Sequence, residues 1–148
     1  MKEKDPNIKH QNILKIHSFV SLLTKDIDQK LDEETETGFS QCMILMYVKD
    51  NPGANQRNIS EGRHITPAAV SRHIENLINK KYIKVSDKKN RKEHSLELSD
   101  RGMDMLQRMI LIVNQELDSL FSDISRREME SMDRIFSRLL SDYFDTNE

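Results

Sequence analysis

The stretch from Thr66 to Leu77, TPAAVSRHIENL, constrains the fold of this chain more than any other part of it. Threonine is a good N-cap residue, and proline is favoured at the first position of a helix. Apolar side chains then recur at helical spacing, at Val70, Ile74, Leu77 and Ile78. The pattern predicts a helix from Pro67 to about Lys80 with one buried face.

The opposite face of this helix has an unusual composition. It carries Ala68, Ala69, Arg72 and Asn76, flanked by His73 and Glu75. Small residues allow close approach, while Arg and Asn make paired contacts to guanine and adenine edges in the major groove. A helix that recognises DNA contacts bases mainly through its N-terminal half. The alternative interpretation of this segment is an ordinary surface helix. The predicted DNA-contacting set is Thr66, Pro67, Ala68, Ala69, Ser71, Arg72, His73 and Asn76, with Thr66 and His73 nearer to phosphate.

The distribution of charge supports DNA binding, although the net charge of −2 taken alone argues against it. Residues 63–92 hold nine Lys or Arg against two acids, which is +7 and leaves −9 for the rest. Closely spaced phosphates favour a local basic surface. A merely solvated charge run is the alternative.

A hairpin is predicted directly after this helix. Residues 83–86 and 94–98 have the composition of short strands, and they flank the polar turn DKKNRK. A thin basic loop can enter the minor groove, where arginine senses groove width. We expect Arg91 to insert and Lys88, Lys89 and Lys92 to contact phosphates; a solvated hairpin without that role is the alternative.

The remaining elements are predicted to be helical. Residues 8 to about 32 are predicted to form one long helix with an apolar stripe on one side. The acidic run DEETETG that follows is predicted to be a linker. Residues 41–49 form a shorter helix, and Asn55, Ser99 and Ser125 are the expected caps of three more. The fold class is therefore mainly α with a small β-hairpin wing.

The ordered motifs between Gln41 and Gly102 resemble those of the MarR family of bacterial winged helix-turn-helix regulators. They read Q-x-x-I-L-x-x-V-x-x-x-P-G, N-Q-x-x-I-S, I-T-P-A-A-V-S-R-x-I-x-x-L, D-x-x-N-R-K and L-S-D-R-G. The resemblance implies a DNA-binding domain at 37–99 and a helical dimerisation region at 1–36 and 100–148. It also implies a homodimer on a near-palindromic DNA site, acting as a repressor released by a small-molecule or redox effector.

Several residues depart from the family pattern. The wing has Asn90-Arg91-Lys92 where the family usually has Asp-Arg-Arg, so a brace for the wing arginine is missing. Lys81 stands where a glycine is usual, which costs energy if the backbone there is left-handed. Arg63 replaces an apolar residue, so it either loosens its helix or adds a phosphate contact. Gly38 stands where a threonine cap is usual.

The sequence says less about an effector. His17, Phe39, Met43 and Tyr47 are candidates for lining a cleft beside the linker. Cys42 is the one candidate redox switch, but its apolar surroundings favour a buried, inert thiol. The five histidines do not cluster, so neither a metal nor another cofactor is expected.

Other classes of function find little support. No nucleophile elbow, phosphate loop or metal-ligand cluster is present, so catalytic residues are not expected. The longest apolar run, at 109–113, is too short for a membrane span, and with no signal peptide in view we expect a cytoplasmic protein. A winged helix that binds another protein remains the alternative to a DNA reader.

Overall fold

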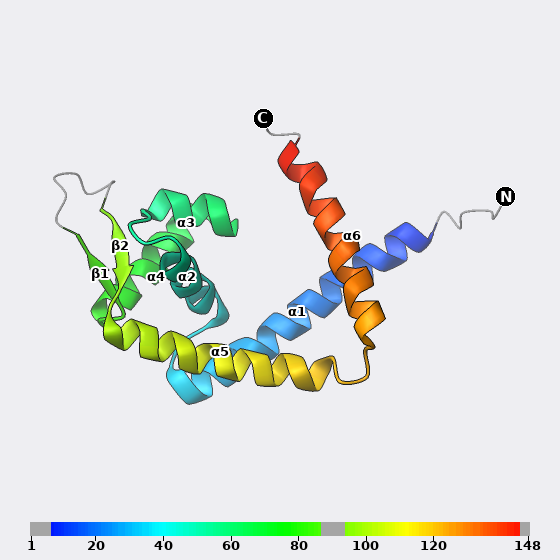
Figure 1. Cartoon of the computed structure of the whole chain (residues 1–148), viewed down its shortest axis with the longest axis horizontal. Coiled ribbons are helices and arrows are strands. Elements are labelled where there is room, and N and C mark those ends of the chain that lie inside the picture. The colour runs from blue at the N-terminus through cyan, green and yellow to red at the C-terminus, as the bar shows by residue number, and fades with distance from the viewer. Residues whose placement is uncertain (1–6, 87–93, 146–148) are drawn as a thin grey trace. The chain divides into compact units, whose positions relative to one another are not determined.

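The computed structural model describes residues 7–86 and 94–145 and contains helices and one hairpin (Figure 1). Residues 1–113 form one compact unit and residues 114–148 a second. The predicted order of helices and strands is confirmed. The elements are α1 (Ile8–Thr35), α2 (Phe39–Asp50), α3 (Gln56–Arg63), α4 (Pro67–Asn79), β1 (Ile83–Val85), β2 (Leu96–Leu98), α5 (Asp100–Leu120) and α6 (Arg126–Asp145).

Four of the predicted helix caps are confirmed. Asn55 and Asn58 form a reciprocal capping box at the start of α3. The Thr66 hydroxyl accepts a hydrogen bond from the Ala69 amide, and the Ser99 hydroxyl accepts one from the Gly102 amide. At α6, the Ser125 hydroxyl accepts the Glu128 amide while the Glu128 carboxylate accepts the Ser125 amide. These caps satisfy amides that have no partner within the first turn of a helix.

The expected acidic linker is wrong over most of its length, because α1 continues to Thr35. The Thr35 hydroxyl donates to the carbonyl of Leu31 and is hydrogen-bonded to the hydroxyl of Thr37, and both threonines are buried. Glu36 then ends the helix in a left-handed conformation, with φ of 54°. Burial of two threonines is a tertiary effect, which the polar composition of this segment conceals.

Helix α2 begins two residues earlier than predicted, at Phe39. The carboxylate of Asp28, on α1, accepts a hydrogen bond from the Phe39 amide at 2.7 Å. Gly38, the N-cap residue, has no side chain with which to cap this helix. The cap therefore comes from another helix, eleven residues away, and a local pattern does not reveal it.

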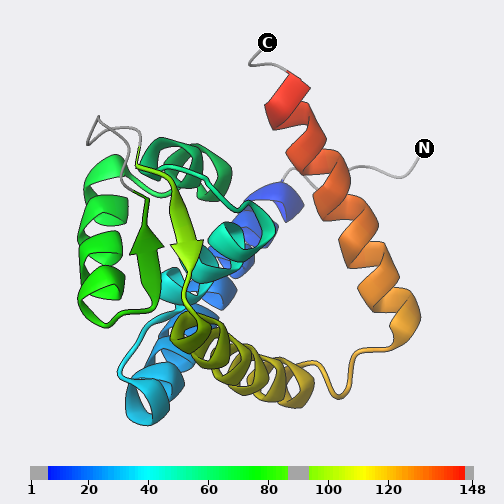
Figure 2. The same ribbon diagram turned by 60° about the vertical axis from the view of Figure 1, so that its left-hand side comes forward.

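The hairpin is confirmed as an antiparallel pair in which Ile83 faces Leu98 and Val85 faces Leu96. It extends beyond the two strands, since the Ser86 amide donates to the carbonyl of Ser95. Figure 2 shows β1 beside α4 within the first unit. The hairpin is thus fixed against α4, while its predicted tip lies outside the described residues.

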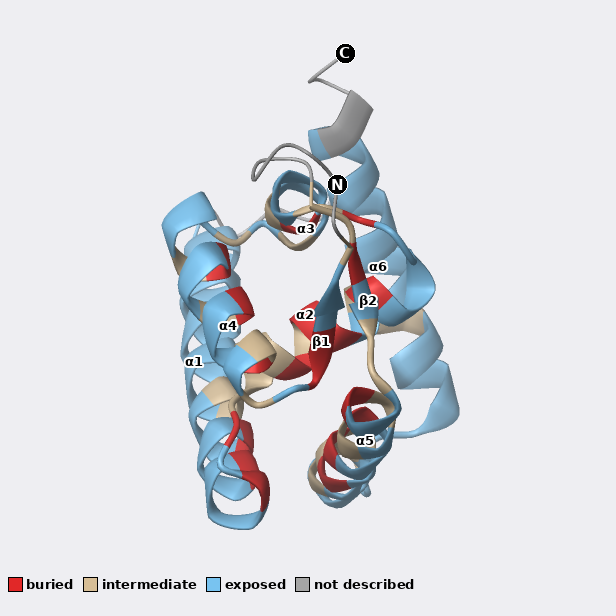
Figure 3. Cartoon of the chain, turned by 90° about the vertical axis from the view of Figure 1, so that its left-hand side faces the viewer, coloured by how far each residue is buried: buried red, intermediate tan, exposed pale blue. Residues whose placement is uncertain are grey.

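One hydrophobic core, in the first unit, holds these elements together (Figure 3). Burial of such side chains is worth about 1.5–3 kcal/mol each before opposing terms. The fully buried members with the largest side chains are Ile27, Leu31, Ile44, Leu45, Ile59, Ile74, Leu77, Leu96, Leu106 and Met109.

Two helices expose apolar side chains that this core leaves uncovered. On α1, Leu14 is 67% exposed and Leu22 62% exposed, although both belong to a helix rich in apolar residues. On α6, Leu139 and Leu140 are half exposed. No helix within the described residues is both long and apolar enough to cross a membrane.

Candidate nucleic-acid interface

Helix α4 has the two faces that its sequence predicts. Val70, Ile74 and Leu77 are buried in the core. The side chains of the opposite face are accessible, with Ala69 and His73 half-buried at its edges. The exposed members of the predicted DNA-contacting set are Thr66, Pro67, Ala68, Ser71, Arg72 and Asn76.

The turn between α3 and α4 fixes the start of this exposed face. The Ser60 hydroxyl donates to the carbonyl of Ile65 at 2.6 Å, and the Ile65 amide donates to the carbonyl of Ser60 at 3.3 Å. His64 between them is left-handed, with φ of 52°. Together with the Thr66 cap, these bonds hold the first turn of α4 and the small side chains that it presents.

His73 is held toward its neutral form. Burial lowers the pKa of His73, and the positive charge of Arg72 lowers it further, while Asp28 on α1 acts in the opposite direction. An uncharged imidazole can still donate or accept a hydrogen bond. At neutral pH, the exposed face of α4 therefore carries its positive charge at Arg72.

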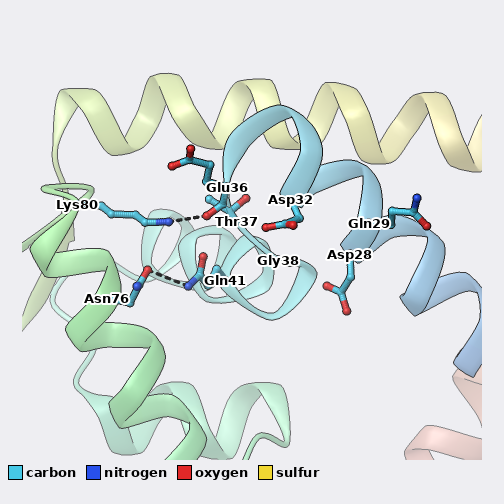
Figure 4. Close-up of a pocket in the computed structure, with 9 residues that line it drawn as sticks. All are labelled: Asp28, Gln29, Asp32, Glu36, Thr37, Gly38, Gln41, Asn76 and Lys80. Atoms are coloured by element: carbon cyan, nitrogen blue, oxygen red, sulfur yellow. Dashed lines mark hydrogen bonds between the residues drawn. The ribbon is translucent and has the colours of Figure 1, made fainter.

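The C-terminal end of α4 is attached to two other elements through side chains (Figure 4). Asn76, a member of the predicted DNA-contacting set, accepts a hydrogen bond from the side-chain amide of Gln41 on α2, at 3.0 Å. Lys80 donates from its ammonium group to the carbonyl of Glu36, where α1 ends. The sequence gives no signal for either contact, since they join residues 35 and 44 positions apart.

These contacts border a pocket of about 490 Å³ between the end of α1, the start of α2 and α4. Figure 4 shows the hydrogen bonds from Gln41 to Asn76 and from Lys80 to Glu36, together with Asp28 and Asp32 of α1. The Oε1 atom of Gln41 is buried and has no hydrogen-bond partner among the described residues. The charged side chains that line this pocket are Asp28, Asp32, Glu36 and Lys80.

After α4 the chain turns through Lys81, whose φ is 62°. The Tyr82 amide donates to the carbonyl of Leu77 and the Lys81 amide to that of Ile78, both at 2.9 Å. This is the hydrogen-bond pattern of a Schellman motif, which favours glycine at the left-handed position. The backbone at Lys81 is therefore left-handed, which is the condition under which a residue other than glycine is expected to cost energy there.

The predicted wing contacts Lys88, Lys89, Arg91 and Lys92 lie outside the described residues. What the structure gives is the base of the wing. Lys84 is exposed on β1 opposite the exposed Glu97 of β2. The Nδ1 atom of His94 lies 3.1 Å from the carbonyl oxygen of Ser86. The two arms of the hairpin are therefore still close together where the described residues end.

The four cleft candidates are not all brought together. Phe39, Met43 and Tyr47 are half-buried along one side of α2, whereas His17 is exposed on α1. Among the described hydrogen bonds and ring contacts, none joins the His17 side chain to the other three.

Tyr47 has a partner that the sequence did not suggest. The guanidinium of Arg63 lies over its ring, 5.5 Å from the ring centre. The Nε atom of Arg63 is buried without a hydrogen-bond partner in the described part of the chain. A Cβ atom at Gly62 would lie 2.4 Å from the same ring, so this glycine makes room for Tyr47.

Cys42 is buried, and burial raises the pKa of its thiol to about 11. The thiolate is the reactive form of cysteine, and the raised pKa keeps Cys42 as the thiol. The structure therefore does not favour Cys42 as a redox switch. No group of three or more His, Cys, Asp or Glu residues within 7–86 and 94–145 is arranged to hold a metal ion.

The sequence model of the MarR family matches residues 37–93, which contain α2, α3, α4 and β1. No curated protein matches the chain by sequence.

Solved structures share the fold over nearly the whole chain. Staphylococcus aureus MarR in complex with salicylate and kanamycin has a TM-score of 0.84 at 16% identity, covering 96% of both chains. A MarR/EmrR family regulator from Acinetobacter has 0.81 at 17% identity, covering 94% of this chain and 99% of its own. The S. aureus MepR–DNA complex has 0.75 at 23% identity, covering 87% and 96%. At these identities the likeness is one of fold, and the family model adds a sequence match to the MarR family over residues 37–93.

Proposed function

We propose that this protein is a sequence-specific double-stranded DNA-binding repressor that acts as a homodimer and is released by a small-molecule effector. Residues 37–99 would read the DNA, and residues 1–36 and 100–148 would pair two copies. The observation that carries the proposal is the exposed face of α4, whose first turns present small side chains and Arg72.

Base reading is assigned to Ala68, Ala69, Ser71 and Arg72. Three of them are exposed on the N-terminal half of α4, the part of a recognition helix that meets base edges. Arginine recognises guanine through two parallel hydrogen bonds. Thr66 and His73 are assigned to phosphates, and the basic wing residues to the adjacent minor groove. DNA binding is supported by the structural similarity to S. aureus MepR, whose structure is a complex with DNA.

Pairing of two copies is supported by apolar side chains that the single chain leaves exposed. They lie on α1 and α6 at helical spacing, and water-exposed apolar surface of this kind marks an interaction site. A dimer with twofold symmetry would present two copies of α4 to two half-sites about one helical turn apart.

Release by a small molecule fits the structure better than release by oxidation. The thiol of Cys42 is buried with a raised pKa, which suppresses its reaction with oxidants. The structure of S. aureus MarR with salicylate and kanamycin shows ligands bound to this fold. Phe39, Met43 and Tyr47 on α2, with His17 of α1, are the candidates for the effector cleft. A bound ligand would shift the spacing of the two α4 helices, so that both half-sites could not be met together.

The decisive experiment is a selection of bound duplexes from a random library, carried out with the full chain at moderate salt. Enrichment of an inverted repeat would support both DNA reading and twofold pairing. A winged helix that binds only another protein would give no enrichment and weak, sequence-indifferent binding. That result would overturn the proposal.

A further inference from the structure

We infer that Lys80 and Gln41 are positioning residues that fix the direction of the recognition helix relative to α1, and so set the half-site spacing that the dimer accepts. The inference rests on the proposed function for its consequence on DNA, but its structural basis lies within one chain. Neither residue is assigned to DNA contact.

The argument begins with the end of α1. Its last carbonyls lack partners within the helix, and they carry the negative end of the helix dipole. The half-buried Lys80 places its ammonium on one of these groups, the carbonyl of Glu36. This hydrogen bond is charge-assisted, and partial burial of the lysine strengthens it relative to one in open water.

The second contact passes through α2. The side-chain amide of Gln41 donates to the carbonyl oxygen of Asn76, one turn before Lys80 on α4. The first turn of α2 is itself attached to α1, because Asp28 accepts the amide of Phe39 at 2.7 Å. The end of α1 therefore holds α4 by two routes, one direct and one through the start of α2 (Figure 4).

The pocket explains why these two side chains matter. About 490 Å³ of open space lies between the end of α1 and α4. No described buried apolar side chain lines it, and apart from Gly38 the residues that line it have polar or charged side chains. The core attaches α1 to this unit through Ile27 and Leu31. Across the pocket, the described side-chain connections to α4 are the hydrogen bonds of Lys80 and Gln41.

A consequence for DNA follows from the geometry of two-site binding. The second half-site is bound at an effective concentration that depends on how narrowly the second reading helix is oriented. If α1 carries part of the dimer contact, the angle between α1 and α4 determines where that helix points. Loosening this angle should weaken binding at the preferred spacing while leaving the contacts to one half-site intact.

The test uses the full chain with Lys80→Met, Gln41→Met and the double variant. Lys80→Arg keeps a cationic donor and serves as the rescue variant. Lys49→Met removes the same charge from an exposed position on α2 and serves as the control. Spin labels at Lys25 and Asn79, in a Cys42→Ala background diluted with unlabelled chain, report the α1–α4 distance within one chain without DNA.

We expect the double variant to broaden the α1–α4 distance distribution about twofold, and Lys80→Arg to keep the width of the parent. On inverted repeats obtained with the wild type, the double variant should lose about threefold to tenfold affinity at the preferred spacing. Its affinity for an isolated half-site should stay within about twofold of the wild type, and its preference among spacers lengthened by one or two base pairs should flatten.

An unchanged distance distribution in the double variant would overturn the inference, whatever happens on DNA. Equal losses of affinity on the isolated half-site and on every spacing would also overturn it. Such losses would mean that Lys80 or Gln41 contacts DNA or that its replacement destabilises the protein. Failure of the wild type to bind any repeat would instead refute the proposed function, and the distance measurement would still decide whether these residues position α4.

Discussion

Lys81 adopts a left-handed backbone angle that is unfavourable for a lysine, at the turn that ends α4. Its left-handed conformation closes α4 and directs the chain into β1. A side chain with a Cβ atom costs about 1–2 kcal/mol in this region, and glycine avoids that cost while losing about 0.5–1 kcal/mol in chain entropy.

We therefore expect Lys81→Gly to be more stable than Lys81→Ala by up to about 1 kcal/mol, since both remove the charge and only one relieves the angle. Urea unfolding of the two variants measures this difference. Equal stabilities, or a more stable alanine variant, would contradict the assignment of strain to Lys81.

His73 should make stability depend on pH. Its pKa lies below the ordinary value of about 6.5, so the folded state binds a proton less readily than the unfolded state. Its contribution is fully present above about pH 6.5 and is lost as the pH falls toward the folded-state pKa.

Replacing His73 with glutamine should make the unfolding free energy fall less steeply as the pH is lowered. The difference in unfolding free energy between variant and wild type should be constant above about pH 6.5 and change below it. Unfolding free energies between pH 8 and pH 5 measure it. His10→Gln, on the exposed surface of α1, should follow the wild type. Parallel profiles for His73→Gln and the wild type would show that burial of His73 has no energetic consequence.

At this scale the sequence predicted the character of individual side chains well. The buried and exposed faces of α4 follow from its periodicity alone, and the strain at Lys81 follows from the family pattern. The partners of Asn76 and Lys80 did not, because Gln41 and Glu36 are remote in sequence. Asn76, which was predicted to contact DNA, thus also makes a hydrogen bond within the protein.

Among the elements, α5 begins in close contact with the backbone that follows α4. A Cβ atom at Gly102 would lie 2.0 Å from the carbonyl oxygen of Tyr82, which follows α4. The Ser99 hydroxyl donates to the carbonyl of Lys81 at 2.6 Å while capping α5. The first turn of α5 therefore packs against the backbone that joins α4 to the hairpin.

Gly102→Ala should destabilise the protein by about 1–3 kcal/mol, because backbone atoms must shift to admit a methyl group. Helix propensity alone predicts the opposite sign, since alanine favours helices over glycine. Thermal unfolding distinguishes the two, with Asp104→Ala on the exposed side of α5 as the control. A stabilised Gly102→Ala protein would show that this contact is not close.

Element ends show where local patterns fail. The four side-chain caps were predicted because each lies within three residues of the amide that it serves. The end of α1 and the start of α2 were missed, since buried threonines and the carboxylate of Asp28 act there across the fold.

For the whole molecule, the exposed apolar faces of α1 and α6 predict self-association. Introducing a charge at Leu14 or Leu139 should convert the proposed dimer into a monomer of 17.4 kDa, because a carboxylate buried without a partner in the interface is costly. Light scattering after size-exclusion chromatography measures the mass of Leu14→Glu and Leu139→Glu. Ser137→Glu, exposed and polar on α6, should remain dimeric. A wild-type protein that is itself monomeric at micromolar concentration would contradict the pairing.

The central claim, that α4 reads bases through its exposed face, is tested most directly by measuring affinities for every single-base variant of a selected operator. The wild type and Arg72→Ala are compared, with Arg108→Ala on α5 as the control. We predict that Arg72→Ala loses about 1–3 kcal/mol, and that this loss removes discrimination at one symmetry-related pair of positions while the others keep theirs. An equal loss on all sequences, or no loss at all, would contradict the account.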